Sequence, residues 1–370
     1  MEQNSKPEIS SEELYKKLQS ERPPLLLDVR GEKKYNEWHI FDSENIPVMK
    51  LLETDEFPDR FRDREIITIC GMGNDSLQAA KHLQNKGFTA FSMHGGLNEW
   101  NTVYDVIDIP INSEVRLTQF RRIAKGCLSY ILSANGQAIV IDPSFNAKSY
   151  LSFIEKNDLL IKKVFDTHLH VDHVSGAKSL AEIVDADLFL PDKDPFNTKY
   201  FDYNPIKHNA EYKLDGTYLK AIHTPGHTKG STSFQIKEFG LLTGDTVFVD
   251  GVGRPDLADK AEEFAKDLYG SISSRILVLP QNMFIAPAHH GKFEFKHFYQ
   301  PIMTSINEIS KDSVAIKEEA DFIQYALEKV QSLPHPPSYK TIRQINAGDL
   351  SMTPAKISEL EIGPNRCAIG

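Results

Sequence analysis

Three histidines and an aspartate lie within seven positions of the sequence, in the stretch THLHVDH at residues 167–173. His168 and His170 alternate along the chain, and alternate side chains of an extended segment project to the same side, so their imidazoles can converge. Asp172 and His173 follow at once and can reach the neighbouring space. Imidazole nitrogens and carboxylate oxygens are common ligands of zinc and of other transition metals. The stretch therefore predicts a metal centre and leaves open whether it holds one ion or two.

Three further side chains of ligand type follow this cluster along the chain. His227 lies in HTPGHT, Asp245 in LTGDT and His289 in APAHH. A tight turn or a strand end holds a side chain rigidly, and α/β folds gather functional side chains at the carboxyl ends of their strands. We therefore expect these three residues to join the first cluster in one metal centre.

A cysteine loop is the second feature with the composition of a reactive site. Cys70 ends the apolar segment IITIC, and a glycine-rich stretch leads from it into a helical pattern. Backbone N–H groups and a helix N-terminus stabilise a thiolate, which makes such a cysteine nucleophilic. The six residues that complete the loop are Gly71, Met72, Gly73, Asn74, Asp75 and Ser76. Cys127, by contrast, lies in an apolar strand-like segment and is interpreted as structural.

The first hundred residues alternate strand-like and helix-like patterns. Strands are expected at 24–29, 66–70 and 89–93, and a helix is expected between the last two, ending at Gly87. This alternation predicts a parallel α/β unit. The periodicity lapses near residue 110, which favours three parts: residues 1–110, residues 111–310 and a C-terminal extension, residues 311–370.

Residues 111–310 are richer in strand-like segments. They include CLSYILS, QAIVID, KKVFD, STSFQI, GLLTGDTVF and MFIAPAHH. The stretch KEEADFIQYALEKVQSL at 317–333 instead carries apolar residues at helical spacing and is expected to be a packing helix of the extension.

Composition narrows the classes of protein to which the chain can belong. Hydrophobic residues make up 40% of the 370 residues and charged residues 25%, and no apolar run approaches the ~18 residues of a membrane span. The formal net charge of −10 argues against nucleic acid as a partner. The N-terminal MEQNSKPEIS is polar and lacks the features of a secretory signal. We expect a cytoplasmic protein without a membrane or nucleic-acid partner, and a homo-oligomer stays compatible with the sequence.

The spacing HxHxDH at 168–173, followed by the later ligand motifs, resembles the signature of the metallo-β-lactamase superfamily over residues 113–310. The resemblance implies an αββα sandwich with metal at its open edge. The superfamily contains two-zinc hydrolases such as glyoxalase II and oxygenases with a single iron. The number of ligands present does not decide between these classes.

Two other segments resemble the persulfide dioxygenases of this superfamily. These are GDTVFVDGVGRPDL at 244–257 and GPNRCAIG at 363–370. The resemblance implies one Fe(II) per chain on His168, His227 and Asp245, a two-histidine one-carboxylate face with open positions. The residues that would then orient ligands and water are His170, Asp172, His173 and His289. Arg254 and Cys367, which lie in the two segments, are expected near the substrate.

The N-terminal part resembles a rhodanese domain over residues 8–105. The resemblance rests on the cysteine loop together with LLLDVR, HIFDSENIP and HGGLNEW. That family carries sulfane sulfur as a cysteine persulfide, which would here form on Cys70. The sequence departs from the pattern at Asp75, where sulfurtransferases commonly have arginine, and at Trp38, where glycine usually precedes the histidine. The first departure puts the use of thiosulfate in doubt.

Together the two resemblances imply one substrate class. The protein is expected to oxidise a low-molecular-weight persulfide of glutathione, coenzyme A or a similar thiol with O₂ and water, giving sulfite and the thiol, in concert with sulfur transfer on Cys70. One alternative is a two-zinc thioester hydrolase of glyoxalase II type. The other is a non-catalytic sulfur carrier or regulatory protein.

Overall fold

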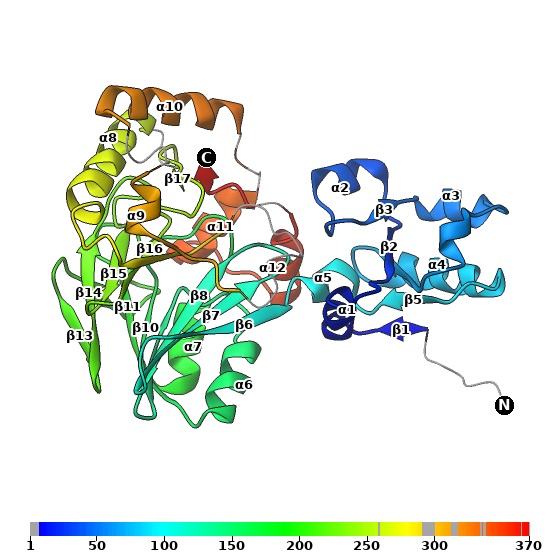
Figure 1. Cartoon of the computed structure of the whole chain (residues 1–370), viewed down its shortest axis with the longest axis horizontal. Helices are drawn as coiled ribbons and strands as arrows, with labels where there is room; N and C mark the ends of the chain where they lie inside the picture. The colour runs from blue at the N-terminus through cyan, green and yellow to red at the C-terminus, as the bar shows by residue number, and fades with distance from the viewer. Residues whose placement is uncertain are drawn as a thin grey trace.

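The computed structural model describes residues 7–257, 260–290, 300–311, 317–333, 335, 338–363 and 365–369. The chain forms a small N-terminal lobe, blue to cyan in Figure 1, and a larger lobe that runs from green to red. No helix in the described ranges is both long enough and apolar enough to cross a bilayer.

A parallel sheet of order β1-β5-β4-β2-β3 lies at the centre of the small lobe. Its strands are β1 (Glu8–Ile9), β2 (Leu25–Asp28), β3 (Glu44–Asn45), β4 (Ile66–Ile69) and β5 (Ala90–Met93). Every residue of β2 and β4 is buried, as expected of parallel strands covered on both faces. The predicted parallel α/β unit is confirmed.

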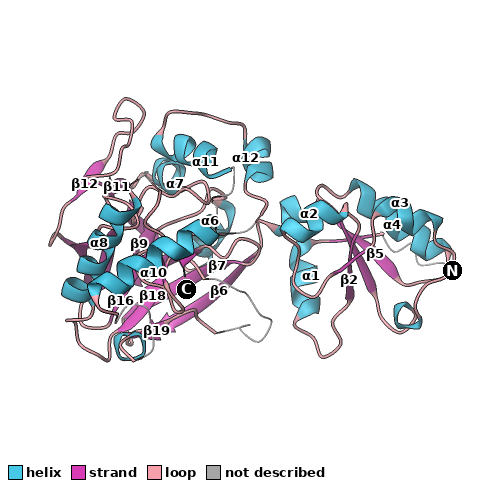
Figure 2. Ribbon diagram, turned by 90° about the horizontal axis from the view of Figure 1, so that it is seen from above, coloured by secondary structure: helices cyan, strands magenta, loops and turns pink. Residues whose placement is uncertain are grey.

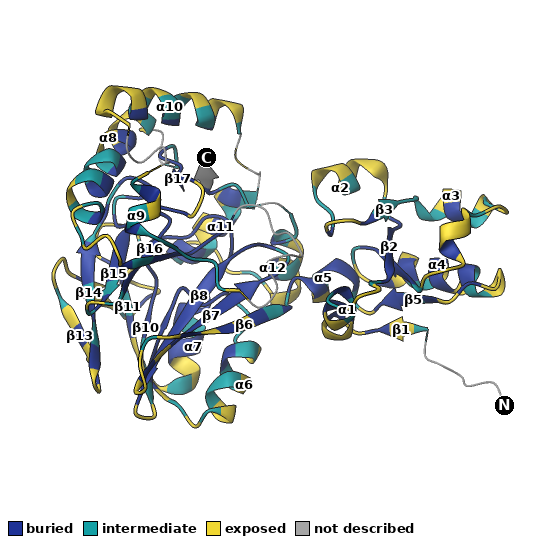
Figure 3. Ribbon diagram, in the orientation of Figure 1, coloured by how far each residue is buried: buried dark blue, intermediate teal, exposed yellow. Residues whose placement is uncertain are grey.

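Helices cover both faces of this sheet. They are α1 (Ser11–Leu18), α2 (Glu32–Glu37), α3 (Val48–Glu53), α4 (Asn74–Asn85) and α5 (Gly96–Trp100), with a 3₁₀ turn at Asp59–Phe61. Leu14 of α1 and Trp100 of α5 share one apolar cluster with the sheet, whereas Leu51 of α3 and Leu83 of α4 share another. Figure 3 shows the resulting buried centre of the small lobe in dark blue.

Two sheets packed face to face form the larger lobe. The first, of order β12-β11-β10-β9-β8-β7-β6, contains β6 (Tyr104–Pro110), β7 (Val115–Arg122), β8 (Leu128–Ala134), β9 (Gln137–Ile141), β10 (Leu160–Phe165), β11 (Asp187–Pro191) and β12 (Asn204–Ile206). The second, of order β13-β14-β15-β16-β18-β19, contains β13 (Glu211–Leu214), β14 (Thr217–His223), β15 (Thr232–Ile236), β16 (Gly240–Gly244), β18 (Phe284–Pro287) and β19 (Thr304–Ser305). Side chains of both sheets meet in one core cluster, among them Leu132 and Phe234.

Each sheet of the sandwich is covered by helices on its outer face (Figure 2). On the first sheet these are α6 (Lys148–Lys156) and α7 (Ala177–Val184), and on the second they are α8 (Ala261–Ser271) and α10 (Glu319–Ser332). Phe322, Ala326 and Val330 form the buried stripe of α10, in the helix expected at 317–333. The predicted αββα sandwich with a C-terminal helical extension is confirmed.

The first strand of the sandwich begins at Tyr104 and pairs along its length with β7. The boundary expected near residue 110 thus falls after this strand and not before it. The sequence misled here because β6 alternates buried and exposed residues over only seven positions, beside a polar turn that resembles a linker.

The C-terminal extension folds back over the metal-binding edge of the sandwich. It continues through α11 (Ser338–Ala347), α12 (Pro354–Leu360) and β20 (Ala368–Ile369), and β20 pairs with β17 (Val252–Gly253). Asn346 of α11 donates hydrogen bonds to the carbonyls of His170 and His173, at 2.9 and 2.7 Å. The extension therefore helps to fix the histidine-rich loop.

A buried ion pair ties the extension to the sandwich. Glu361, 2% exposed, accepts a 2.6 Å hydrogen bond from Arg122, 4% exposed, and another of 2.6 Å from the amide of Val174. Arg122 also donates to the carbonyl of Asn101, at the junction with the small lobe. Burial raises the pKa of Glu361, but the charge and hydrogen bond of Arg122, together with the hydrogen bond from the Val174 amide, hold this pKa below its ordinary value.

Removal of this carboxylate is expected to destabilise the protein strongly. Glu361→Ala leaves the Arg122 guanidinium buried without its counter-charge, so the free energy of unfolding should fall by about 3–5 kcal/mol. Urea denaturation followed by circular dichroism measures the change. Glu359→Ala removes an exposed carboxylate of α12, the helix that ends just before Glu361. It is the matched control and should cost less than about 0.5 kcal/mol. Equal losses in the two variants would contradict this role of the ion pair.

Candidate metal centre and sulfur site

The histidine-rich loop begins where β10 ends, and two buried carboxylates fix its backbone. Asp142, just after β9, accepts hydrogen bonds from the amide and the hydroxyl of Thr167, at 2.7 and 3.0 Å. Asp194 accepts one from the amide of Leu169, at 2.8 Å. Because these bonds replace the regular ladder of a strand, residues 167–173 can turn their imidazoles inward at the edge of the sandwich.

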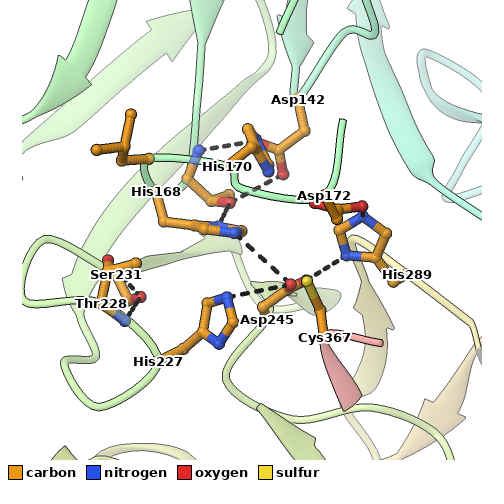
Figure 4. Close-up of polar contacts among 12 residues, drawn as sticks. Asp142, His168, His170, Asp172, His227, Thr228, Ser231, Asp245, His289 and Cys367 are labelled. Carbon is orange, nitrogen blue, oxygen red and sulfur yellow. Dashed lines mark hydrogen bonds and ion pairs between the residues drawn. The ribbon is translucent and has the colours of Figure 1, made fainter. Parts of the chain in front are cut away.

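Three ligand-type atoms converge at this edge. His168 Nε2 and His227 Nε2 lie 3.6 and 3.4 Å from Asp245 Oδ2, and all three atoms are within 4.8 Å of one another. The three side chains are buried. None of these three atoms has a hydrogen-bond partner among the residues that the structure describes. Figure 4 shows the two imidazoles directed toward the Asp245 carboxylate.

The outer atoms of these side chains set the tautomers of the imidazoles. His227 Nδ1 lies 2.9 Å from the carbonyl oxygen of Arg254, so it must donate its hydrogen there. His168 Nδ1 lies 2.9 Å from Thr167 Oγ1, whose own hydrogen is donated to Asp142, so His168 also donates from Nδ1. Both Nε2 atoms therefore present a lone pair to the centre, as a metal requires.

Charges at the centre also favour cation binding. Burial lowers the pKa of His168 well below its ordinary value, and repulsion from His170 lowers it further. Burial raises the pKa of Asp245, but the charge and hydrogen bond of His289, together with the other nearby histidines, hold it below its ordinary value. Neutral imidazoles beside an ionised carboxylate are the protonation states that bind a metal. The residues present thus fit a metal ion on a face of two histidines and one carboxylate.

A second group of ligand-type atoms lies beside the first and contains Cys127, Asp172, His173 and His289. Asp172 Oδ2 is 2.8 Å from His289 Nε2, and Asp172 Oδ1 is 3.2 Å from His173 Nδ1. His289 Nδ1 in turn lies 2.6 Å from Asp245 Oδ1. His289 thus joins the carboxylates of the two groups, one with each ring nitrogen.

Cys127 was interpreted from the sequence as structural, but its thiol belongs to this second group. Cys127 Sγ lies 3.8 Å from Asp172 Oδ2. Burial raises the pKa of this thiol, but the charge of His173 and the hydrogen bonds of His173 and His289 together lower it to about 6. The bridge between the backbones of Cys127 and His289 places the thiol here. The sequence signal was only a glycine that interrupts the apolar segment just before it.

His170 belongs to a third group, with Asp142 and Asp166. His170 Nε2 is 3.1 Å from Asp142 Oδ1 and 3.8 Å from Asp166 Oδ1. Burial raises the pKa of Asp166 to about 6. Neither aspartate was anticipated from the sequence. Their common signal is an aspartate directly after an apolar strand, in VIDP and VFDT. The seven expected ligand residues are therefore divided among three adjoining groups.

Arg254 and Cys367 lie beside the centre in different ways. The buried guanidinium of Arg254 pairs with Asp256 at 2.7 Å and donates to the carbonyls of Leu333 and Arg366, at 2.8 and 2.9 Å. It therefore ties the segment after Asp245 to the extension. Cys367 is fully buried in the same space as Asp245 and His289 in Figure 4, and burial holds the pKa of its thiol well above the ordinary value.

The cysteine loop of the small lobe connects β4 to α4. Gly73 donates its amide hydrogen to Cys70 Sγ at 3.1 Å, and Ser76 Oγ lies 3.3 Å from the same sulfur. Gly73 has φ 97°, and a Cβ there would lie 3.0 Å from the amide nitrogen of Gly95. Glycine is therefore required for the loop to curl around the sulfur. Asp75 is exposed in the first turn of α4.

Comparisons with known proteins agree with this division of the chain. The model of the metallo-beta-lactamase superfamily matches residues 122–290, and that of the rhodanese-like domain matches residues 10–102. An uncharacterized protein of Mycobacterium leprae, ML0493, is 30% identical over 190 residues, which cover 44% of this chain and 86% of the relative. A hydroxyacylglutathione hydrolase of Prochlorococcus marinus is 27% identical over 139 residues, 36% of this chain and 54% of that enzyme.

Two solved structures resemble the chain at similar levels. A metallo-beta-lactamase from Staphylococcus aureus is 26% identical with a TM-score of 0.58, covering 65% of this chain and 74% of that structure. ETHE1 from Myxococcus xanthus is 25% identical with a TM-score of 0.55, covering 63% of this chain and 99% of that structure. With the αββα sandwich, the convergent ligand atoms and these matches in agreement, the chain belongs to the metallo-beta-lactamase superfamily and carries a rhodanese-like domain ahead of its metal-binding fold.

Proposed function

We propose that the protein oxidises a low-molecular-weight persulfide with O₂ and water to sulfite and the free thiol, at one iron held by His168, His227 and Asp245. Cys70 of the rhodanese-like lobe carries sulfane sulfur of the same substrate class. In the reaction a persulfide RSSH, O₂ and H₂O give RSH, sulfite and two protons, so all atoms balance.

The observation that carries this proposal is the convergence of His168 Nε2, His227 Nε2 and Asp245 Oδ2. These three atoms lie within 4.8 Å of one another and have no hydrogen-bond partner among the described residues. His289 Nδ1 lies 2.6 Å from the other oxygen of Asp245, so this ring orients the carboxylate of the first group. This supports one metal ion on a two-histidine one-carboxylate face, the ligand set of mononuclear iron oxygenases.

The chain's own contribution is to prepare this face. An iron ion bound there supplies the redox chemistry that O₂ requires before it can react with a persulfide sulfur. Thr167 and the Arg254 carbonyl hold both imidazoles in the tautomer that offers Nε2. Burial of all three ligands excludes bulk water, and His289 holds the Asp245 carboxylate in place through its second oxygen.

The comparisons and motifs support the same assignment. The segments at 244–257 and 363–370 resemble persulfide dioxygenases, and residues 364 and 370 lie outside the described residues. Within the described part the two segments meet, because β17 pairs with β20. The structure of ETHE1 from Myxococcus xanthus covers 63% of this chain. The rhodanese-like lobe adds a buried thiol that accepts the Gly73 amide, an environment suited to holding a persulfide anion.

A two-zinc thioester hydrolase is the second candidate function. Cys127, Asp172, His173 and His289 offer ligand atoms within 4.8 Å of one another, and a hydroxyacylglutathione hydrolase is among the relatives. In this case His289 would turn from Asp245 to the second ion. A sulfur carrier without dioxygenase activity is the third, and it would use Cys70 alone.

The iron-binding face should depend on the hydroxyl that orients His168. Thr167→Val removes this acceptor at nearly constant volume, so iron affinity is expected to fall about 10–100-fold. His227→Ala should abolish iron binding, and His208→Ala, at an exposed histidine outside the centre, should retain it. Elemental analysis of anaerobically purified protein and chelator competition measure these effects. Two zinc ions per chain, bound more tightly than iron, would contradict the proposal.

Oxygen uptake tests the reaction. Glutathione persulfide added to the iron-loaded protein should consume O₂ and release an equal amount of sulfite, and Asp245→Ala should abolish both. Cys70→Ser should retain this uptake, because the thiol of the small lobe is not part of the metal centre. Rapid hydrolysis of lactoylglutathione without persulfide-dependent O₂ uptake would instead establish the hydrolase.

Asp75 should hinder thiosulfate as a sulfur donor. Its exposed carboxylate lines the same cleft as Cys70 and repels a dianion, although solvent screening weakens the effect. Asp75→Arg is expected to raise thiosulfate-dependent sulfur transfer by roughly 2–5-fold, the range typical of exposed charge pairs. Glu21→Arg, also at an exposed site, controls for net charge. If thiosulfate-dependent sulfur transfer by Asp75→Arg is unchanged or lower, the Asp75 carboxylate does not act on the donor.

A further inference from the structure

A cleft of about 1170 Å³ lies between the two lobes. Cys70 and residues of its loop line one side, together with residues of the α2 region. Lys125 of the sandwich and residues of the C-terminal extension, among them Ser338 and Arg366, line the other. This volume slightly exceeds the range of about 300–1,000 Å³ for small-molecule sites and holds a ligand of tripeptide size.

Lys125 is the most unusual residue of the cleft. It lies in the turn between β7 and β8 and is only 4% exposed, yet no hydrogen bond or ion pair of its ammonium is found among the described residues. Its neighbour Arg122, in contrast, is paired with Glu361. Burial lowers the pKa of Lys125, and attraction to the negative charges of Asp172, Cys127 and Glu361 does not offset it. A buried ammonium without a contacting counter-ion is costly, and an anion that enters from the cleft removes this cost.

The wall that contains Lys125 is also the outer cover of the metal centre. Two residues after Lys125, the thiol of Cys127 contacts Asp172. In the C-terminal extension, Asn365 precedes Arg366 and donates to Asp172 Oδ2 at 3.2 Å. A molecule in the cleft therefore lies between Cys70 and the layer of residues that surrounds the metal ligands.

The charges at the cleft favour an anionic ligand that also carries a positive group. Basic side chains outnumber acidic ones among the described lining residues, five to three. The basic residues are Arg30, Lys33, Lys34, Lys125 and Arg366, and the acidic residues are Glu37, Asp75 and Glu359. Arg30 is engaged by Asp28 at 2.6 Å, which leaves Lys125 as the buried cation that faces the cleft.

We propose that this cleft binds a small thiol that carries a carboxylate, with the carboxylate on Lys125 and the sulfur directed to Cys70. The choice of a thiol rests on the function proposed above, whereas the choice of a carboxylate rests on Lys125. The ligand is the carrier that exchanges sulfur with Cys70, and Lys125 is the residue that selects it by charge.

Calorimetric titration of the full-length, metal-loaded protein with S-methylglutathione tests this site, because the methylated sulfur can neither transfer nor be oxidised. Lys125→Met, which keeps the length of the side chain without its charge, should weaken binding at least about tenfold. Lys125→Arg should restore most of it. The dimethyl ester of the same probe, which lacks free carboxylates, should bind weakly and equally to the wild type and to Lys125→Met.

Three results would overturn the proposal: no binding of S-methylglutathione, equal binding by Lys125→Met with its fold verified by circular dichroism, or an ester that binds as well as the acid. Lys125-dependent binding of S-methyl coenzyme A alone would replace the carboxylate by a phosphate and would also overturn it. The titration involves no reaction, so it tests the cleft independently of the proposed function. If the protein shows persulfide-dependent O₂ uptake but does not bind S-methylglutathione, only the proposal about the cleft is wrong. If the protein binds S-methylglutathione but shows no persulfide-dependent O₂ uptake, only the proposed reaction is wrong.

Discussion

The carboxylate of Asp142 is the anchor on which the metal centre depends. It accepts the amide and hydroxyl of Thr167 and lies 3.1 Å from His170 Nε2. Because the Thr167 hydroxyl is thereby used as a donor, it can only accept from His168, which turns the lone pair of His168 Nε2 inward. This buried carboxylate thus fixes the start of the loop and the tautomer of a proposed ligand, while Asp194 holds the amide of Leu169. The sandwich contributes by placing Asp142 at the end of β9, beside the end of β10.

The C-terminal extension is part of this centre and not an appendage. Glu361 joins Arg122 of the sandwich to the amide of Val174, and Asn346 holds the carbonyls of the histidine-rich loop. Arg122 reaches the junction with the small lobe as well. The C-terminal extension that packs on the metal centre therefore also lines the cleft on the side opposite Cys70. The metal centre and the cleft thus share one structural support.

The sequence was sufficient for the fold class and for the residues with strong local patterns. His168, His227 and Asp245 lie in short motifs at strand ends, and they converge as such motifs predict. Asp142 and Asp166 were missed because an aspartate after a strand is common and acquires meaning only when another strand brings a histidine to it. The place of Cys127 beside the metal ligands was not predicted because it depends on the pairing of its backbone with that of His289, which is far away in the sequence. The cleft and Lys125 were out of reach for the same reason, since their walls are separated by large distances in sequence.

The location of bound iron tests the central claim most directly. Anomalous X-ray scattering at the iron edge, from crystals of the iron-loaded protein, measures it without reference to activity. The account predicts one peak per chain, among His168 Nε2, His227 Nε2 and Asp245 Oδ2, with His289 still bridging Asp172 and Asp245. Two peaks per chain, or a single peak among Asp172, His173 and His289, would contradict it.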